Sequence, residues 1–250
     1  KAITGATRSS FTLTTSQAGR AMSVRITGTK AGHASATSTS TATPRVMTAG
    51  TPAVSGTPVY GSTLTTRTGT WTASTRLAYA WLADGVVLKG ATSSTLKLGA
   101  STRGKRIAVR VTGSRSGYAT VSRTSSATAR VATVATPTVA GTRLVTYTLS
   151  ARVGSWTSGT TFRYQWYANG KALTGATRAS LGLGTKHVGK RISVRVTGSK
   201  AGYPTVARTS AATGLIGYPN RTQPSSEWNC PSWAPIKGNA DSMIYHVPSG

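Results

Sequence analysis

Apolar and polar residues alternate along several short stretches of this chain. The alternation is clearest in Leu77-Ala-Tyr-Ala-Trp81, Phe162-Arg-Tyr-Gln-Trp166 and Arg191-Ile-Ser-Val-Arg-Val196. A period of two, with many β-branched and aromatic residues, predicts half-buried β-strands. The pairs Asp84-Gly85 and Asn169-Gly170 follow two of these stretches and are typical of tight hairpin turns. Helical periodicity is absent, so the pattern predicts an all-β protein.

The whole pattern returns every 85 residues without a gap. The positions that show this most plainly are Gly5, Gly90 and Gly175, Val24, Val109 and Val194, and Trp81 and Trp166. A fixed period indicates a tandem array of one small module. About seven short strands per period, with a tryptophan on the third, predict an immunoglobulin-like Greek-key β-sandwich. The first copy holds only the second half of the period, so we expect its sandwich to be incomplete.

The period divides the chain into four expected parts. Residues 1–48 are the second half of an Ig-like repeat, residues 49–133 and 134–218 are complete repeats, and residues 219–250 form a tail. In the tail the period stops and Gly and Pro cluster, which predicts a short, mostly irregular segment. No stretch approaches 18 consecutive apolar residues, so no transmembrane segment is predicted.

The charge of the chain is strongly positive. It has 30 Lys and Arg residues against three Asp and Glu residues, a net charge of +27. Asp84 is the only acidic residue among residues 1–218. Such a chain attracts polyanions, among them nucleic acid, wall polymers and acidic lipids, through counterion release. Because no recognition helix, aromatic RNA-binding motif or zinc-finger spacing is present, nucleic acid is expected to bind only non-specifically.

Many of the cations recur at the module period, and we expect them to form a polyanion-binding surface. These residues are Arg20, Arg25, Lys30, Lys105, Arg106, Arg110, Arg115, Lys190, Arg191, Arg195 and Lys200. Arg25, Arg110 and Arg195 alternate with core-facing valines and should therefore point to solvent. A generic solubilising surface is the alternative, although solubility alone does not require the loss of nearly every acid.

Catalytic groups are scarce in the repeats. Residues 1–218 offer only Asp84, His33 and His187 for acid–base chemistry. Asp84 lies in a turn that the next copy fills with Asn169, so turn geometry explains it. Calcium sites need several oxygen ligands, mostly carboxylates. We therefore expect no enzymatic activity, no cofactor and no metal site.

Four tryptophans could form a stacking platform for sugar rings or bases, or could pack in the core. Their position on apolar strand faces favours core packing. They are Trp71, Trp81, Trp156 and Trp166.

A longer motif within each period carries a family resemblance. The string G-x-W, Y-x-W, N/D-G, G-A-T and G-K-R-I-x-V-R-V-T-G-S-[KR]-x-G-Y, over residues 1–218, resembles the bacterial immunoglobulin-like repeats of actinobacterial secreted proteins. In that family the repeats serve as stalks or wall-associated spacers, which implies a secreted or cell-surface location. The family usually carries an acid two residues before the Gly of the G-K strand start. Here Gln17, Thr102 and His187 occupy that position.

The tail carries a second resemblance. The stretch CPSWAPIKGNADSMIYHVPSG, from Cys230 onward, resembles the opening of the sunset domain, a small C-terminal module of actinobacterial secreted proteins. The resemblance implies a disulfide between Cys230 and a second cysteine outside this chain. A nucleophile or metal site built from Cys230, Asp241 and His246 is the alternative, although the paired spacing of zinc ligands is missing.

Together these features predict a non-enzymatic, secreted, cell-surface or wall-associated stalk. Its cationic faces would bind anionic wall polymers, teichoic acid or similar, through many weak contacts that add together. One alternative is a subunit of an extracellular filament, in which the incomplete first sandwich takes its missing strands from another copy of the chain. Another is an accessory wall-binding region of a secreted hydrolase or nuclease.

Overall fold

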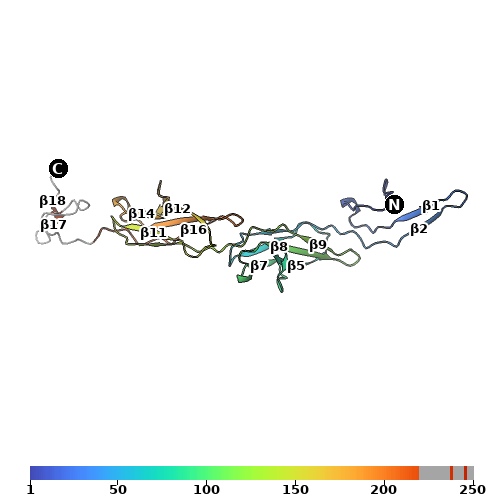
Figure 1. Ribbon diagram of the computed structural model, residues 1–250, viewed down its shortest axis with the longest axis horizontal. Coiled ribbons are helices and arrows are strands. Elements are labelled where there is room, and N and C mark those ends of the chain that lie inside the picture. Colours follow the sequence, from blue (N-terminus) through green and yellow to red (C-terminus); the bar gives the residue numbers. More distant parts are fainter. Residues whose placement is uncertain (220–236, 239–244, 247–250) are drawn as a thin grey trace. The chain divides into compact units, whose positions relative to one another are not determined.

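The computed structural model describes residues 1–219 and two short strand segments of the tail, 237–238 and 245–246. These residues form β-strands joined by turns, with three single-turn 3-10 helices (Figure 1). The all-β prediction is confirmed. No helix in this part of the chain is long and apolar enough to cross a membrane. Cys230 and most of the sunset-like stretch lie outside the described residues.

The chain forms two compact units. Among the described residues, unit 1 holds 1–135, 155–162 and 197–207, and unit 2 holds 136–154, 163–196 and 208–219. The boundaries at 48/49, 133/134 and 218/219 stay predictions, because these units follow contacts and not the 85-residue period.

Unit 1 contains a complete seven-stranded sandwich. One sheet has the order β3-β4-β7 and the other has the order β6-β5-β8-β9. In immunoglobulin lettering these sheets are A-B-E and C′-C-F-G, so the Ig-like prediction is confirmed. The strands are β3 (Ala53–Ser55), β4 (Thr63–Arg67), β5 (Arg76–Ala83), β6 (Val86–Val87), β7 (Thr95–Lys97), β8 (Ile107–Ser114) and β9 (Val121–Thr124).

The core of this sandwich follows from the alternation in its strands. The inward residues of β8 are fully buried, and they pack with residues of β4 and β5 in one apolar cluster. That cluster contains Leu64, Trp81, Leu98, Ile107, Val109, Val111 and Val131. Arg110 lies between two of the buried valines and is exposed, as a period of two requires.

The third copy repeats this strand order, and the fully buried residues of its core belong to unit 2. Its strands belong to the sheets β10-β11-β14 and β13-β12-β15-β16. They are β10 (Thr138–Ala140), β11 (Thr148–Arg152), β12 (Thr161–Ala168), β13 (Lys171–Ala172), β14 (Ser180–Gly182), β15 (Ile192–Ser199) and β16 (Val206–Thr209). Trp166, Leu149, Ile192, Val194 and Val196 are fully buried, in the positions that the repeat predicts. In the tail, β17 (Lys237–Gly238) pairs with β18 (Tyr245–His246).

The two hairpin turns have the predicted geometry. Asp84 and Asn169 have φ angles of 47° and 46°, and the glycines after them also have positive φ, as a type I′ turn requires. The Asp84 carboxylate accepts a hydrogen bond from the Arg106 backbone N–H at 2.9 Å. The Asn169 side-chain oxygen accepts the equivalent bond from Arg191 at 2.8 Å. The turn interpretation of Asp84 is therefore confirmed.

The first copy is a hairpin with no second sheet. It consists of η1 (Thr15–Gln17), β1 (Arg25–Gly28) and β2 (Ala36–Thr39), and β1 and β2 form a two-stranded sheet (Figure 1). Arg25 pairs with Thr39 and Gly28 with Ala36. Adding 85 to these numbers gives the β8–β9 register, in which Arg110 pairs with Thr124 and Gly113 with Val121. The hairpin is thus the same in the incomplete copy as in the complete one.

The four tryptophans fall into two classes. Trp81 and Trp166 are fully buried, which confirms the core prediction for them. Trp71 and Trp156 are half-buried, and Trp71 packs against the core cluster, as predicted. The Trp71 indole N–H donates to the Thr68 carbonyl at 2.9 Å, and the Trp156 ring packs edge-on against Phe162 at 5.4 Å between centroids.

Candidate polyanion-binding surface

The arginines in the middle of the F-type strands point away from the core. Arg110 on β8 and Arg195 on β15 are exposed between fully buried valines, and Arg25 on β1 is exposed as well. The outward orientation expected from alternation is confirmed for Arg110 and Arg195, whereas for Arg25 it stays a prediction because Val24 and Ile26 beside it are also exposed. Each guanidinium can therefore approach an anion in solution without any rearrangement of the strands.

The cations in the turn after this strand are partly tied to the backbone. The Arg115 guanidinium donates to the Ala73 carbonyl at 2.6 Å and lies 4.7 Å from the centre of the Tyr118 ring. Lys200 donates to the Ser158 carbonyl and lies 5.3 Å from the Tyr203 ring. Stacking on a ring holds a cation in place and leaves its charge uncancelled.

Lys30 occupies the same register in the first copy. Its side chain is exposed, and His33 stands where the other copies have tyrosine. The cation–aromatic pair is thus present in the second and third copies and absent from the first.

The cations at the start of the strand are also exposed or half-buried. Arg106 and Arg191 each fix a hairpin turn through their backbone N–H. Their guanidinium groups reach the carbonyls of Thr128, at 3.5 Å, and Thr213, at 3.2 Å. Of the remaining predicted residues in this region, Arg20 and Lys105 are exposed and Lys190 is half-buried.

Two further arginines were missed by the sequence reasoning. The Arg45 and Arg130 side chains donate at 2.8 Å to Gly19 and Gly104, the glycines of the G-[KR] turns. The Arg45 backbone N–H donates to Gly117 at 2.9 Å. In unit 1 the Arg130 backbone N–H likewise donates a hydrogen bond to the Gly202 carbonyl. Their spacing of 85 residues was the available signal, and it brings two more cations close to the predicted ones.

Charge compensation within the described repeats is minimal. The Arg130 guanidinium lies 3.8 Å from the Asp84 carboxylate, and both side chains are more than 40% exposed (42% and 45%). Exposed pairs of this kind contribute little to stability. Because no other carboxylate side chain occurs among residues 1–218, the remaining cations there are not neutralised by acids of the same region.

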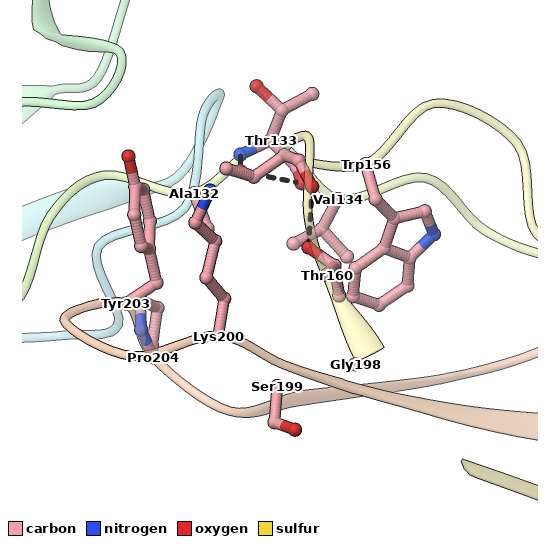
Figure 2. Close-up of a pocket in the computed structure, with 11 residues that line it drawn as sticks. Ala132, Thr133, Val134, Trp156, Thr160, Gly198, Ser199, Lys200, Tyr203 and Pro204 are labelled. Carbon is pink, nitrogen blue, oxygen red and sulfur yellow. Dashed lines mark hydrogen bonds between the residues drawn. The ribbon is translucent and has the colours of Figure 1, made fainter. Parts of the chain in front are cut away.

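A narrow cleft in unit 1 lies beside Lys200. Figure 2 shows Lys200 and Tyr203 on one side of it and Trp156 on the other. The space that it encloses is about 10 Å³, far below the range of about 300–1,000 Å³ typical of small-molecule sites. The arrangement is suited to contacts along a charged surface and not to enclosure of a small ligand.

His187 is a buried titratable side chain close to two of the lysines. Its Nδ1 accepts a hydrogen bond from the Gly184 N–H at 2.9 Å, and its Nε2 has no partner among the described residues. Burial lowers the pKa of His187, and the charges of Lys186 and Lys190 lower it further. His187 is therefore neutral near pH 7 and adds nothing to the positive charge.

No protein-family model and no curated protein matches this chain. Among solved structures, it resembles a Ca²⁺-stabilized adhesin that helps an Antarctic bacterium reach out and bind ice, with 16% identity and a TM-score of 0.30. That match covers 80% of this chain and spans 57% of the adhesin chain. Murine CEACAM1b matches with 10% identity and a TM-score of 0.30, over 66% of this chain and 99% of the other. At this level of similarity the function must be argued from the chain's own surface.

Proposed function

We propose that this chain is a non-enzymatic, secreted or cell-surface array of Ig-like modules that binds anionic polymers through its cationic faces. The observation that supports the proposal is the recurrence of exposed arginines, Arg25, Arg110 and Arg195, at the same position of the equivalent strand in each copy. The single acid of residues 1–218 leaves this charge uncompensated. Anionic wall polymers of the teichoic-acid type are the proposed partners.

The proposed mechanism is electrostatic and cumulative. A long polyanion releases counterions at each contact, so the attraction is strong at low salt and declines steeply as salt rises. Single contacts to exposed cations are weak. Because the same cations return once per repeat, one polymer can engage several copies at once, and the contacts add through effective concentration.

The test compares two triple variants of the full chain. One replaces Arg25, Arg110 and Arg195 with alanine. The matched control replaces Lys89, Lys97 and Lys171, which are equally exposed and lie elsewhere. Both variants lower the net charge from +27 to +24 (27 − 3). Binding to purified teichoic acid and to random-sequence duplex DNA is measured at several salt concentrations.

We expect the arginine triple to weaken binding more than the lysine triple and to reduce the slope of log affinity against log salt by about one per lost contact. Equal losses in both variants would show diffuse attraction without a defined face. Binding that does not change with salt would contradict the proposal entirely.

A filament subunit is a second candidate function. It is favoured by the exposed apolar face of the first copy, where Val24 and Ile26 are open to solvent. Strand addition between copies of the chain would assemble them end to end.

A further inference from the structure

The second and third copies meet at a joint within unit 1. The joint contains residues of both copies, 103–105, 130–133 and 200–203. The Arg130 backbone N–H donates to the Gly202 carbonyl at 2.9 Å. A Cβ atom on Gly104 would meet the Tyr203 hydroxyl oxygen at 3.7 Å. The turn of the third copy therefore lies against the turn at Gly104 of the second copy.

Three cations of the second copy gather at this turn. The Arg130 guanidinium donates to the Gly104 carbonyl at 2.8 Å. Arg103 and Lys105 precede and follow the glycine, and both are exposed. The Arg103 guanidinium lies 3.8 Å from the centre of the Tyr60 ring. Stacking of this kind holds a cation in place and leaves its charge uncancelled.

The third copy adds a cation and a hydroxyl to the same joint. Lys200 Nζ lies 5.3 Å from the centre of the Tyr203 ring, and Figure 2 shows these two side chains next to each other. The Tyr203 hydroxyl is the group that approaches Gly104, and a phenol hydroxyl can donate a hydrogen bond to an anion. Each copy therefore supplies groups that can bind an anion at one place.

The charge of this cluster is largely uncompensated. The Asp84 carboxylate lies 3.8 Å from the Arg130 guanidinium, and it is the only acidic side chain among residues 1–218. Four cations and one acid leave a net charge of +3 (4 − 1) at the joint. A ligand with a single negative charge would not neutralise it, whereas several consecutive groups of a polyanion would.

The third copy lacks the cluster at its own corresponding end. An apolar residue stands at the position of each arginine and of the tyrosine that stacks on one of them. The residues of the second copy are Tyr60, Arg103 and Arg130, and their equivalents 85 residues later are Val145, Val188 and Leu215. The tail, and not another repeat, follows this end of the third copy. In the second copy the cluster thus occurs where a further copy follows.

The backbone at this end has the same hydrogen bonds with and without the cluster. The Tyr60 N–H donates to the Ala132 carbonyl at 2.8 Å. The equivalent Val145 N–H donates to the Gly217 carbonyl at 3.0 Å. Because the bond forms without the aromatic ring and its arginine, local folding does not account for the cluster, whereas binding of an anion does.

We infer that this joint is a binding site for consecutive phosphate groups of a flexible phosphodiester chain, such as poly(glycerol phosphate). The groups that would hold the phosphates are the side chains of Arg103, Lys105, Arg130, Lys200 and Tyr203. A glycerol phosphate chain can fold several charges onto one small cluster. A polyuronate carries each charge on a rigid sugar ring, and a DNA duplex is stiff and must bend at a cost.

The inference rests on the proposed function for the class of polymer and adds the place where a segment is held. That place exists only where two copies meet. A short synthetic oligo(glycerol phosphate) with a fluorescent label is the probe, and its binding to the full chain is measured by fluorescence anisotropy. We expect saturable binding that weakens as salt rises, and weaker binding of an oligogalacturonate of equal charge.

The first variant places residues of the third copy in the joint. Arg103→Val combined with Arg130→Leu should weaken binding of the oligomer about tenfold, because two charge-assisted contacts are lost. The matched control combines Arg67→Leu with Arg123→Val, at exposed positions on β4 and β9. Both variants lower the net charge from +27 to +25 (27 − 2). The control should change the affinity by no more than about twofold, because distant charges are screened.

The second variant tests the side of the third copy. Lys200→Met combined with Tyr203→Phe should also weaken binding about tenfold, because it removes a cation and a hydroxyl donor. Far-UV circular dichroism and thermal melting of each variant show whether the fold is kept. A cluster that only stabilises the joint would lower the melting temperature and leave the affinity for the oligomer unchanged, which would overturn the inference.

The remaining outcomes separate this inference from the proposed function. If long teichoic acid binds the unaltered chain in a salt-dependent manner and either joint variant binds the oligomer as tightly as the control does, the inference is wrong and the proposed function stands. If neither the long polymer nor the oligomer binds the unaltered chain, both are wrong. Equal binding of the oligogalacturonate, or tighter binding of a short DNA duplex, would also overturn the inference.

Discussion

Residues 1–48 and residues 86–133 are the same hairpin in two environments. The pairing register of β1 with β2 equals that of β8 with β9, and the side-chain pattern is shared. In one copy the apolar face is exposed, and in the other it is buried under a second sheet. The comparison shows that the strand pairing is the same in both copies, whereas burial of the apolar face is seen where strands from the first half of the repeat pack on it.

The largest difference is expected for a charge placed on that face. Val109→Asp would bury an uncompensated carboxylate and should destabilise its repeat by at least about 4 kcal/mol. Val24→Asp should change stability by no more than about 0.5 kcal/mol, because its side chain is already in water. Hydrogen-exchange mass spectrometry of β8 and β1 measures the two effects locally. Similar losses of protection in both variants would mean that the first copy is also covered in solution.

A smaller difference is expected for the strand glycines. Gly113→Ala forces the Trp71 ring to move and should cost about 1–3 kcal/mol. Gly28→Ala meets open space and should be neutral, or stabilising by up to about 1 kcal/mol through a less flexible unfolded chain. Urea unfolding followed by circular dichroism separates the two outcomes. A destabilising Gly28→Ala would contradict the open face described for the first copy.

The smallest expected effect is a pH dependence of stability at position 187, where the third copy has a titratable histidine and the other copies do not. Its equivalents Gln17 and Thr102 do not titrate near neutral pH, whereas protonation of His187 would put a hydrogen on the Nδ1 atom that accepts the Gly184 N–H. The pKa of His187 is lowered in the folded state. Below the ordinary value of 6.5 the unfolded chain therefore binds more protons. The stability that neutral His187 gives is complete above that pH and is lost as the pH falls below it.

Thermal melting at about pH 7.5 and pH 5.5 measures this effect. His187→Thr, which introduces the residue of the second copy, should reduce the difference between the two melting temperatures. An unchanged difference would show that another group causes the acid sensitivity.

Much of the fold could be predicted from the sequence because the determining interactions are local or periodic. Alternation identified the buried Val109 and the exposed Arg110, and the pair Asp84-Gly85 identified a turn whose φ angles only such residues adopt easily. The partial exposure of Trp71 could not be predicted in the same way. Its apolar context resembles that of Trp81, and only the three-dimensional contact with Gly113 separates them.

The candidate surface was partly predictable for the same reason. The exposure of Arg110 and Arg195 follows from a period of two. The carbonyl contacts of Arg45 and Arg115 do not, because they join residues 26 and 42 positions apart in the chain and leave no mark on local patterning. Whether these cations bind a polymer stays a prediction.

The main chain at Arg45 has a mechanical consequence. Its N–H donates to the Gly117 carbonyl at 2.9 Å, and its own carbonyl accepts from Ala119 at 3.0 Å. Bending or stretching the chain here would break both bonds at once. The segment at Arg45 should therefore lengthen little under tension. Its backbone hydrogen bonds restrain it, whereas a flexible linker would extend freely.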